Sequence, residues 1–408
     1  MKQHFSSRAA GARRSAIREL LKLTEHPDII SFGGGLPAPE TFPHNELAEI
    51  AADLLRNEYR NVLQYGTTEG SRTLRRAMVE WLRPQGIDVT LDELLVTSAS
   101  QQGLDLLCKA FFDPGDVVFC DLPTYLGAVQ AFSLFQVDKL GVPLEDDGMD
   151  IDALEERVLE ARAAGKTLKG VYVIPDFQNP SGITMSLAKR KALLSVACRE
   201  DLLIFEDNPY GHLRFAGKPI PSIFSMDREG RTILLLTFSK VMSAGLRLAV
   251  MAARGDLMDA LVRVKQPTDL CTSKLTQMLA ARYMETYGLD RHLADIRPIY
   301  YEKKQAMIRA LEKHMPDEEG LRWTNPDGGL FIWVWLPDGV DAEEMLGRAI
   351  EHRVAYVPGS TSYVDGGGKN TMRLSFSLCT PAEIDEGIRR LADVVSEAIA
   401  ARKVGAAT

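Results

Sequence analysis

A lysine flanked by hydroxyl side chains is the residue with the clearest chemical potential. Thr237-Phe-Ser-Lys240 follows the apolar run Thr232–Leu236, which is typical of a buried parallel strand. Burial at a strand end disfavours the ammonium form, so we expect a lowered pKa for Lys240 and an amine suited to attacking an aldehyde. Hydroxyls at Thr237 and Ser239, with a guanidinium at Arg247, offer phosphate ligands beside it. Alone, the pattern also fits an ordinary strand end with a solvated lysine.

Polar side chains follow other apolar runs in the same way. Asp207 comes after the run Leu202–Phe205, and its carboxylate is suited to a cationic ring nitrogen or to starting a turn. Asn179 lies in an Asn-Pro-Ser-Gly turn and supplies a neutral amide donor for a phenolate oxygen. Tyr125 follows another run, where it can stack on a planar ring or pack in the core.

Two further groups are suited to binding anions. Ser100 and Gln101 begin a predicted helix directly after the run Leu94–Thr97, where free N–H groups and the helix dipole favour phosphate, although an ordinary N-cap has the same composition. Arg373 lies within the alternating segment Met372–Leu378. Its planar fork suits a carboxylate, and the alternative is an exposed sheet face with a solvated arginine. Together these groups are what pyridoxal 5′-phosphate (PLP) chemistry requires.

Alternating strands and helices are predicted to position these groups. From residue 94 onward, apolar runs alternate with amphipathic segments, which indicates a mostly parallel sheet with helices on both faces and functional groups at the carboxyl ends of its strands. The predicted strands are 94–97, 116–120, 170–174, 202–205, 232–236 and 247–252, and the helices between them include 101–112, 186–200 and 257–265.

A second domain is predicted after a long helix at 289–314. Short strands at 329–335, 354–357 and 372–378, with helices at 342–351 and 381–400, indicate an α+β unit. We therefore expect an N-terminal arm at 1–45, a large domain at 46–285 and a small domain at 286–408.

Composition excludes several functional classes. The 408 residues carry a net charge of −8, from 56 acidic and 48 basic residues, which does not favour binding to nucleic acid or to an anionic membrane. The five cysteines are scattered and form no CxxC pair, so we expect neither disulfides nor a metal site. No apolar run approaches the length of a membrane span and no secretory signal begins the chain, which predicts a cytoplasmic protein.

The motifs resemble those of the fold type I PLP-dependent aminotransferases (class I/II), within the 2-aminoadipate/kynurenine group. The resemblance runs almost end to end, from Gly34-Gly-Leu-Pro-Ala-Pro39 to Val357-Pro-Gly359 and Met372–Ser377. It implies an aspartate aminotransferase-like α/β fold with a mostly parallel, seven-stranded-type sheet in a large PLP-binding domain, plus a small α+β domain. It also implies a ping-pong reaction through pyridoxamine phosphate.

The resemblance further implies the substrates and the assembly. The amino donor is expected to be an L-amino acid with an acidic, long polar or aromatic side chain, and the acceptor a 2-oxo acid such as 2-oxoglutarate. The active sites are expected to be shared within a homodimer. Tyr65 of one subunit is expected to reach the cofactor phosphate of the neighbouring subunit.

Residue roles follow from the same resemblance. Lys240, Asp207 and Tyr125 form the expected catalytic set: Lys240 binds the cofactor aldehyde, Asp207 pairs with the pyridinium nitrogen and Tyr125 stacks on the ring. The other expected cofactor ligands are Asn179 and Tyr210 at the ring hydroxyl, and Ser100, Gln101, Thr237, Ser239 and Arg247 at the phosphate. The expected substrate ligands are Arg373 for the α-carboxylate, Asn179, the backbone near Gly35, and Arg18 for the side chain.

Some positions depart from the family pattern. Ala99 stands where the family usually has glycine in the phosphate turn. In the segment after the lysine, Ala244 stands where proline is usual, and Ser362 stands where an aromatic residue is usual. Two alternatives therefore stay open. One is another PLP enzyme on this scaffold, such as a lyase, a racemase or a carbon–carbon bond-forming enzyme. The other is a non-enzymatic regulator, which the short segment before Gly33 disfavours.

Overall fold

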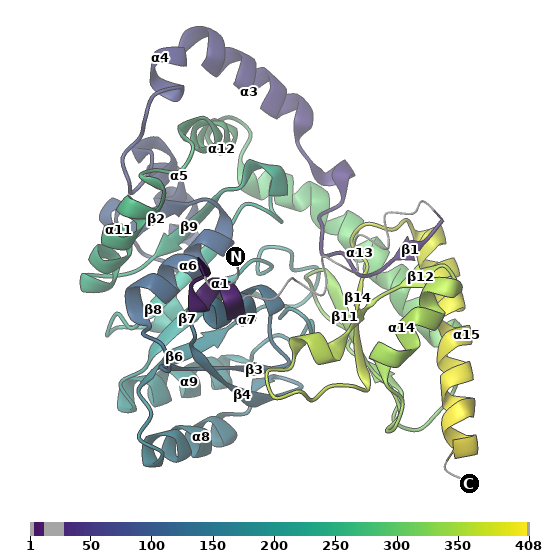
Figure 1. Cartoon of the computed structure of the whole chain (residues 1–408). Helices are drawn as coiled ribbons and strands as arrows, with labels where there is room; N and C mark the ends of the chain where they lie inside the picture. Colours follow the sequence, from purple (N-terminus) through teal and green to yellow (C-terminus); the bar gives the residue numbers. More distant parts are fainter. Residues whose placement is uncertain (1–3, 12–27, 406–408) are drawn as a thin grey trace.

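A computed structural model describes residues 4–11 and 28–405. Its largest element is an eight-stranded sheet in the order β2-β9-β8-β7-β6-β3-β4-β5 (Figure 1). The strands, in that order, are Leu94–Thr97, Ala249–Ala252, Thr232–Thr237, Leu203–Asn208, Leu168–Val173, Val117–Leu122, Asp138–Glu145 and Gly148–Met149. The central pairs β8–β7, β7–β6, β6–β3 and β3–β4 are parallel, as the alternating pattern predicts.

The sheet departs from the expected strand set in two places. Strands β4 and β5 extend one edge, where the sequence analysis predicts none. Strand β9 runs antiparallel to both of its neighbours, β2 and β8. Its predicted start at Arg247 is also wrong, because Arg247 lies in a left-handed turn and the strand begins at Ala249.

Helices cover both faces of this sheet. Alternate residues of the central strands, such as Val117 and Ile204, pack with α8 (Ile151–Ala163) and α9 (Leu187–Arg199) in one apolar cluster. Their neighbours, such as Val118, face a larger cluster that includes residues of α6 (Ala99–Phe111), α7 (Leu126–Leu134) and α11 (Asp256–Asp269). Burial on both faces explains why these strands are continuous apolar runs.

A second sheet, in the order β10-β11-β14-β13, lies beside the first (Figure 1). Its strands are Arg322–Trp323, Phe331–Trp335, Thr371–Ser375 and Val357–Pro358, all antiparallel. The predicted strand 354–357 is two strands, because β12 (Val354–Ala355) pairs instead with β1 (Ile30–Ser31). The predicted strand 372–378 ends at Ser375. Helices α13 (Leu289–His314), α14 (Ala342–Glu351) and α15 (Pro381–Gly405) pack around this unit.

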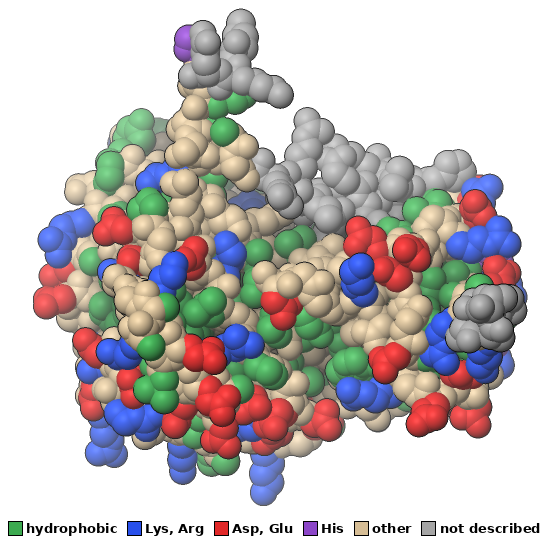
Figure 2. Space-filling view, turned by 60° about the horizontal axis from the view of Figure 1, so that its bottom comes forward, with side chains coloured by type: hydrophobic (Ala, Val, Ile, Leu, Met, Phe, Trp, Pro, Cys, Tyr) green, Lys and Arg blue, Asp and Glu red, His purple; other side chains and the backbone are tan. Residues whose placement is uncertain are grey.

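The remaining helices frame the large sheet. Helix α12 (Lys274–Thr286) packs on α3 (His44–Asn57) and α5 (Arg72–Leu82), and α3 leads into α4 (Tyr59–Val62) at the upper edge in Figure 1. Two further short helices are α1 (Ser7–Gly11) and α10 (Ile223–Met226). The described 3-10 turns are Pro39–Thr41, Arg83–Gln85, Leu91–Glu93, Ala244–Leu246 and Gly359–Ser362. Acidic and basic side chains are intermingled over the face drawn in Figure 2. Within residues 4–11 and 28–405, no helix is both long and apolar enough to cross a bilayer.

Candidate active site

A cavity of about 390 Å³ lies between the two sheets, at the carboxyl ends of the central parallel strands. It brings together side chains from distant parts of the sequence, because parallel strands end at one edge of a sheet. Among the described residues, every predicted site residue except Tyr65 lines it. Its lining residues without a predicted role are Leu36, Ala99, Leu104, Leu126, Gly127, Gln130, Ile174, Pro209, Ala244 and Phe331.

Lys240 lies in the turn that follows β8, half-buried in this cavity. Its Nζ donates a hydrogen bond to the carbonyl oxygen of Gly35, at 2.6 Å. Burial, together with the positive charges of Arg373 and Arg247, lowers the pKa of Lys240 to about 8. The lysine is therefore not the solvated side chain of an ordinary strand end, and its free amine is accessible near neutral pH.

Asp207 projects from β7 on the same side of the sheet. Its Oδ2 accepts a hydrogen bond from the Tyr172 hydroxyl at 2.9 Å, while its buried Oδ1 has no hydrogen-bond partner among the described residues. Burial raises the pKa of Asp207 to about 6, against the opposing effect of the Tyr172 hydrogen bond. An orphaned carboxylate oxygen of this kind requires a donor, and a protonated ring nitrogen supplies one.

The contribution of Tyr172 was missed from the sequence. In the structure, Tyr172 and Phe205 are partners across the parallel pair β6–β7, so Tyr172 and Asp207 face the same side. The residue types offered one signal for this contact. A single tyrosine hydroxyl in an otherwise apolar strand needs a polar partner when buried.

Asn179 connects the cofactor-binding and substrate-binding groups. Its Nδ2 lies 3.4 Å from the Tyr210 hydroxyl, to which it donates, and its Oδ1 accepts from Nη1 of Arg373 at 2.9 Å. Tyr210 is buried, and burial raises its pKa. The two residues predicted to meet the ring hydroxyl are therefore adjacent.

Arg373 projects from β14 and is only 4 % exposed. Its Nη2 donates to the carbonyl oxygen of Gly33 at 2.6 Å, and its guanidinium lies 4.3 Å from the centre of the Phe331 ring. Burial lowers the pKa of this arginine to about 10. The alternative of a solvated arginine on an exposed sheet face is wrong. Gly33 and Phe331, which hold the fork, were not predicted.

Hydroxyl groups gather at one end of the cavity. Thr237 Oγ1 donates to Ser239 Oγ at 2.9 Å and accepts from the Ser239 N–H at 3.1 Å. The buried Ser100 Oγ has no partner within the part of the chain that the structure describes. With the Arg247 guanidinium nearby, these groups match the donor set that a phosphate needs.

Ala99 starts α6 beside this cluster with a positive φ of 65°. This left-handed conformation costs a non-glycine residue roughly 1–2 kcal/mol. The usual glycine at this position would avoid the cost. The departure noted in the sequence is therefore a locally strained turn that still directs Ser100 toward the cavity.

Tyr125 stands at the N-cap of α7, where its ring lines the cavity. A Cβ atom added to Gly127 would lie 2.5 Å from that ring, so glycine is required for the ring to lie where it does. Gln101 Nε2 donates to the Gly127 carbonyl at 3.4 Å. Ser362 does not line the cavity, but its carbonyl accepts from the Thr124 N–H at 2.8 Å and so supports the segment before Tyr125.

The structure does not place the last two predicted site residues, Tyr65 and Arg18, in this cluster for different reasons: one lies elsewhere and the other is not described. Tyr65 is 76 % exposed and lies outside the cavity of its own chain. Arg18 falls outside the described residues, so its role stays a prediction.

The polar groups that line the cavity fit PLP. The Lys240 amine suits the aldehyde, Asp207 Oδ1 suits the ring nitrogen, and the hydroxyls beside Arg247 suit the phosphate. The orphaned buried atoms Asp207 Oδ1 and Ser100 Oγ are ones that a ligand with a cationic ring and a phosphate would satisfy.

Known proteins share this sequence and structure over nearly the full chain. Residues 27–391 match the family model of aminotransferase class I and II. Aromatic-amino-acid aminotransferase 1 of Thermococcus litoralis is 45 % identical, over 97 % of this chain and 94 % of that protein.

Solved structures of known proteins are also similar to this chain. Kynurenine aminotransferase of Pyrococcus horikoshii, in complex with PMP, superposes with a TM-score of 0.93 at 44 % identity, covering 97 % of this chain and 98 % of the other. The α-aminoadipate aminotransferase of Thermus thermophilus, complexed with N-(5′-phosphopyridoxyl)-L-leucine, gives 0.90 at 42 % identity, covering 98 % and 99 %. The predicted fold type is confirmed. The chain belongs to the class I and II aminotransferase family and is a PLP-dependent transaminase.

Proposed function

We propose that this transaminase moves the amino group of an L-amino acid with an aromatic, acidic or long polar side chain to a 2-oxo acid such as 2-oxoglutarate. Relatives named for aromatic amino acids, kynurenine and α-aminoadipate support this range of donors. The carrying observation is that Lys240, Arg373 and Asp207, the last at the end of β7, line one cavity.

Each proposed role uses a polar atom of a residue that lines the cavity. When bound, PLP supplies an electrophilic carbonyl and an electron-withdrawing ring. Asp207 Oδ1 would keep the ring nitrogen protonated, because the hydrogen bond from Tyr172 is made through Oδ2 and leaves Oδ1 without a partner among the described residues. Lys240 Nζ, with its lowered pKa, takes the α-proton of the amino acid and later releases it. The phosphate would be held by Thr237, Ser239, Ser100 and Arg247, which would fix the ring.

Arg373 orients the substrate. Its buried guanidinium is held by Asn179 and Gly33, and its Nε has no partner among the described residues. A carboxylate that enters the cavity can therefore meet a preorganised cation whose reorientation costs little. Arg18 would contact the substrate side chain, as the family resemblance implies.

The Arg373→Lys variant tests this assignment. A lysine cannot reproduce the planar fork, so we expect kcat/KM for the amino donor to fall by about 100-fold or more, whereas PLP affinity changes little. Steady-state kinetics and cofactor titration give the two values. Arg322→Lys is the matched control, because Arg322 lies on the same sheet but is exposed and stacks on Trp335. Equal effects of the two substitutions would refute the substrate role of Arg373.

We further propose a homodimer with shared active sites. Large apolar side chains are exposed along one segment: Leu55 (43 %), Tyr59 (48 %), Leu63 (65 %) and Tyr65 (76 %). Exposed apolar side chains gathered in this way mark interaction surfaces. A second copy of the chain would cover this segment and bring Tyr65 to the neighbouring phosphate.

The remaining proposals concern compartment and domains. The five free cysteines support a reducing compartment such as the cytoplasm. The two separate sheets support an arm at 1–45, a large domain at 46–285 and a small domain at 286–408.

A further inference from the structure

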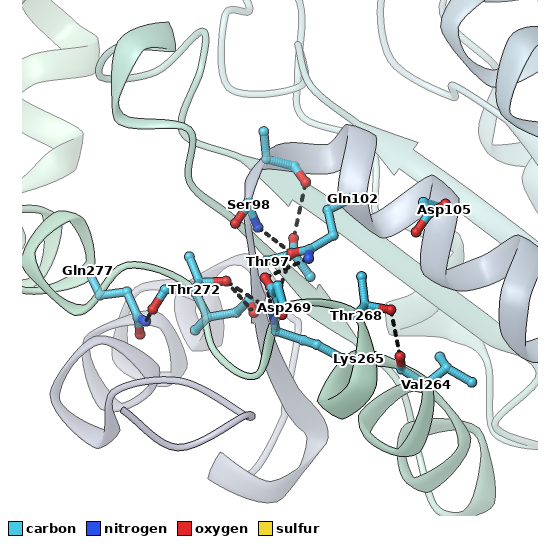
Figure 3. A network of polar contacts seen from close by, with 12 residues as sticks. Thr97, Ser98, Gln102, Asp105, Val264, Lys265, Thr268, Asp269, Thr272 and Gln277 are labelled. Carbon is cyan, nitrogen blue, oxygen red and sulfur yellow. Dashed lines mark hydrogen bonds and ion pairs between the residues drawn. The ribbon is translucent and has the colours of Figure 1, made fainter. Parts of the chain in front are cut away.

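A polar network contacts the strained turn at Ser98–Gln101 (Figure 3), and none of its residues lines the cavity. We call it the junction network, and it consists of Gln102, Lys265, Asp269 and Thr272. It joins three segments: the start of α6, the end of α11 and the loop that follows α11.

Lys265 is the centre of the junction network. Its side chain is fully buried, and Nζ donates to Asp269 Oδ1 at 2.7 Å, to Asp269 Oδ2 at 2.8 Å, to Thr272 Oγ1 at 3.1 Å and to Gln102 Oε1 at 3.3 Å. Thr272 Oγ1 in turn donates to the carbonyl oxygen of Val96, in β2. The lysine therefore connects α11 to both the strand and the helix that flank the turn.

Gln102 carries the connection into the turn itself. Its Nε2 donates to Asp269 Oδ2 at 2.6 Å, and its Oε1 accepts from the backbone N–H of Ser98 at 2.7 Å. Ser98 is the N-cap of α6 and directly precedes Ala99, whose φ is 65°. The carboxamide of Gln102 thus fixes the backbone on the N-terminal side of the strained residue.

Strain and burial together point to a role for this network. A non-glycine residue stays left-handed only where its surroundings determine the conformation. The ion pair joins the fully buried Lys265 to the partly exposed Asp269. Such a pair contributes little to stability compared with apolar packing, and its best-supported use is to select one conformation. The turn carries Ser100 and Gln101, two predicted phosphate ligands that line the cavity.

We propose that Lys265, Asp269 and Gln102 are positioning residues that hold Ala99 in its left-handed conformation and so aim Ser100 Oγ and the start of α6 at the cofactor phosphate. The proposal rests on the proposed phosphate role of Ser100. It assigns a function to side chains that do not touch the cavity.

The Lys265→Met variant removes the centre of the network with little change in volume. We expect PLP to bind about tenfold more weakly, equivalent to about 1.4 kcal/mol, together with a shifted ³¹P resonance of the bound phosphate. The dissociation constant is measured by titrating the apoprotein, and urea unfolding of the apoprotein reports stability separately. Gln102→Met is a second variant that cuts the link to Ser98, and we expect the same changes.

Lys303→Met is the matched control. Lys303 is 5 % exposed and pairs with a carboxylate, that of Glu40 at 2.6 Å, but it lies in α13 and does not line the cavity. We expect a loss of apoprotein stability without a change in PLP affinity or in the ³¹P resonance. If Lys265→Met and Lys303→Met alter the cofactor measurements alike, the network has only a structural role and the proposal is wrong.

Ala99→Gly tests the strain itself. Glycine adopts the left-handed conformation without support, so in this background Lys265→Met should weaken PLP binding by about threefold or less. An undiminished tenfold loss would contradict the proposal. Ser100→Ala separates its failure from that of the phosphate assignment: if Ser100→Ala leaves PLP affinity unchanged, the turn does not bind phosphate and both assignments fall.

Discussion

At the scale of single residues, Asp207 is a functional group whose burial lowers the stability of the apoprotein. Its carboxyl is 2 % exposed, and Oδ1 has no partner within the described parts of the chain. Burial therefore raises its pKa to about 6. Between the usual value of about 4 and this value, the unfolded chain has lost a proton that the folded apoprotein retains. Stability of the apoprotein consequently falls as pH rises through this window.

Asp207→Asn should remove that dependence. We expect the apoprotein variant to be more stable than the wild type by roughly 1–3 kcal/mol above about pH 7, with the difference vanishing below about pH 4. PLP should bind it more weakly, because an amide cannot hold a protonated ring nitrogen as a carboxylate does. Urea unfolding across the pH range measures the first effect. Parallel pH profiles for the two proteins would show that Asp207 is not a buried, unpaired acid.

At the scale of elements, the site depends on how closely α6 approaches the sheet. A Cβ atom on Gly103 would lie 2.8 Å from Leu235 Cδ2, in β8, and 3.4 Å from Met251 Sδ, in β9. Glycine at this position lets the helix that begins at the phosphate turn lie directly on the strands. The same residue type in α14 has no such role, because a Cβ on Gly347 would meet no atom within 4 Å.

Gly103→Ala and Gly347→Ala should therefore have opposite effects. Overpacking at Gly103 is expected to destabilise the protein by about 1–3 kcal/mol, whereas Gly347→Ala should stabilise it by about 0.5–1 kcal/mol through helix propensity. Thermal or urea unfolding of the holoenzyme measures both. Stabilisation by both substitutions would mean that α6 has room to move away from β8.

The packing of the elements explains which parts of the fold could be predicted from the sequence. The central strands were found because burial on both faces makes them continuous apolar runs, and their ends locate Asp207, Asn179 and Lys240. Strand β4 was missed because it is only partly buried and includes Lys139 and Pro143. The antiparallel direction of β9 depends on long-range pairing that no local pattern records.

Contacts between distant segments were the hardest to predict. The carbonyls of Gly33 and Gly35, which bind Arg373 and Lys240, come from a segment with no regular pattern. The motifs predicted which side chains meet in the site and a substrate contact from the backbone near Gly35, but not that these carbonyls accept hydrogen bonds from Arg373 and Lys240. The junction network is a further case, because Lys265 lies on an ordinary amphipathic helix in the sequence.

At the scale of the whole molecule, the proposed dimer would complete each site. Tyr65 lies in an exposed apolar segment and outside the cavity of its own chain. If it binds the neighbouring phosphate, a site takes Lys240 from one subunit and Tyr65 from the other. Inactive variants of the two residues should then complement each other.

Mixed subunits test this arrangement. A heterodimer of a Lys240→Ala chain and a Tyr65→Ala chain contains one site with both native residues. Refolding an equal mixture should give about one quarter of wild-type activity, because half of the dimers are mixed and each has one intact site. Sedimentation confirms the dimer mass. Activity no greater than the average of the two variants would place Tyr65 in the site of its own chain or in none.

Lys240 is proposed to move the α-proton of an amino acid held by Arg373. The most direct measurement is a single-turnover half-reaction of PLP-loaded protein with aromatic amino acids, kynurenine and 2-aminoadipate, followed by cofactor absorbance and 2-oxo acid release. We predict one 2-oxo acid per subunit for the wild type, and a rate at least about 10³-fold lower for Lys240→Ala at saturating PLP. A Lys240→Ala protein that reacts at a rate within about tenfold of the wild type would contradict the account.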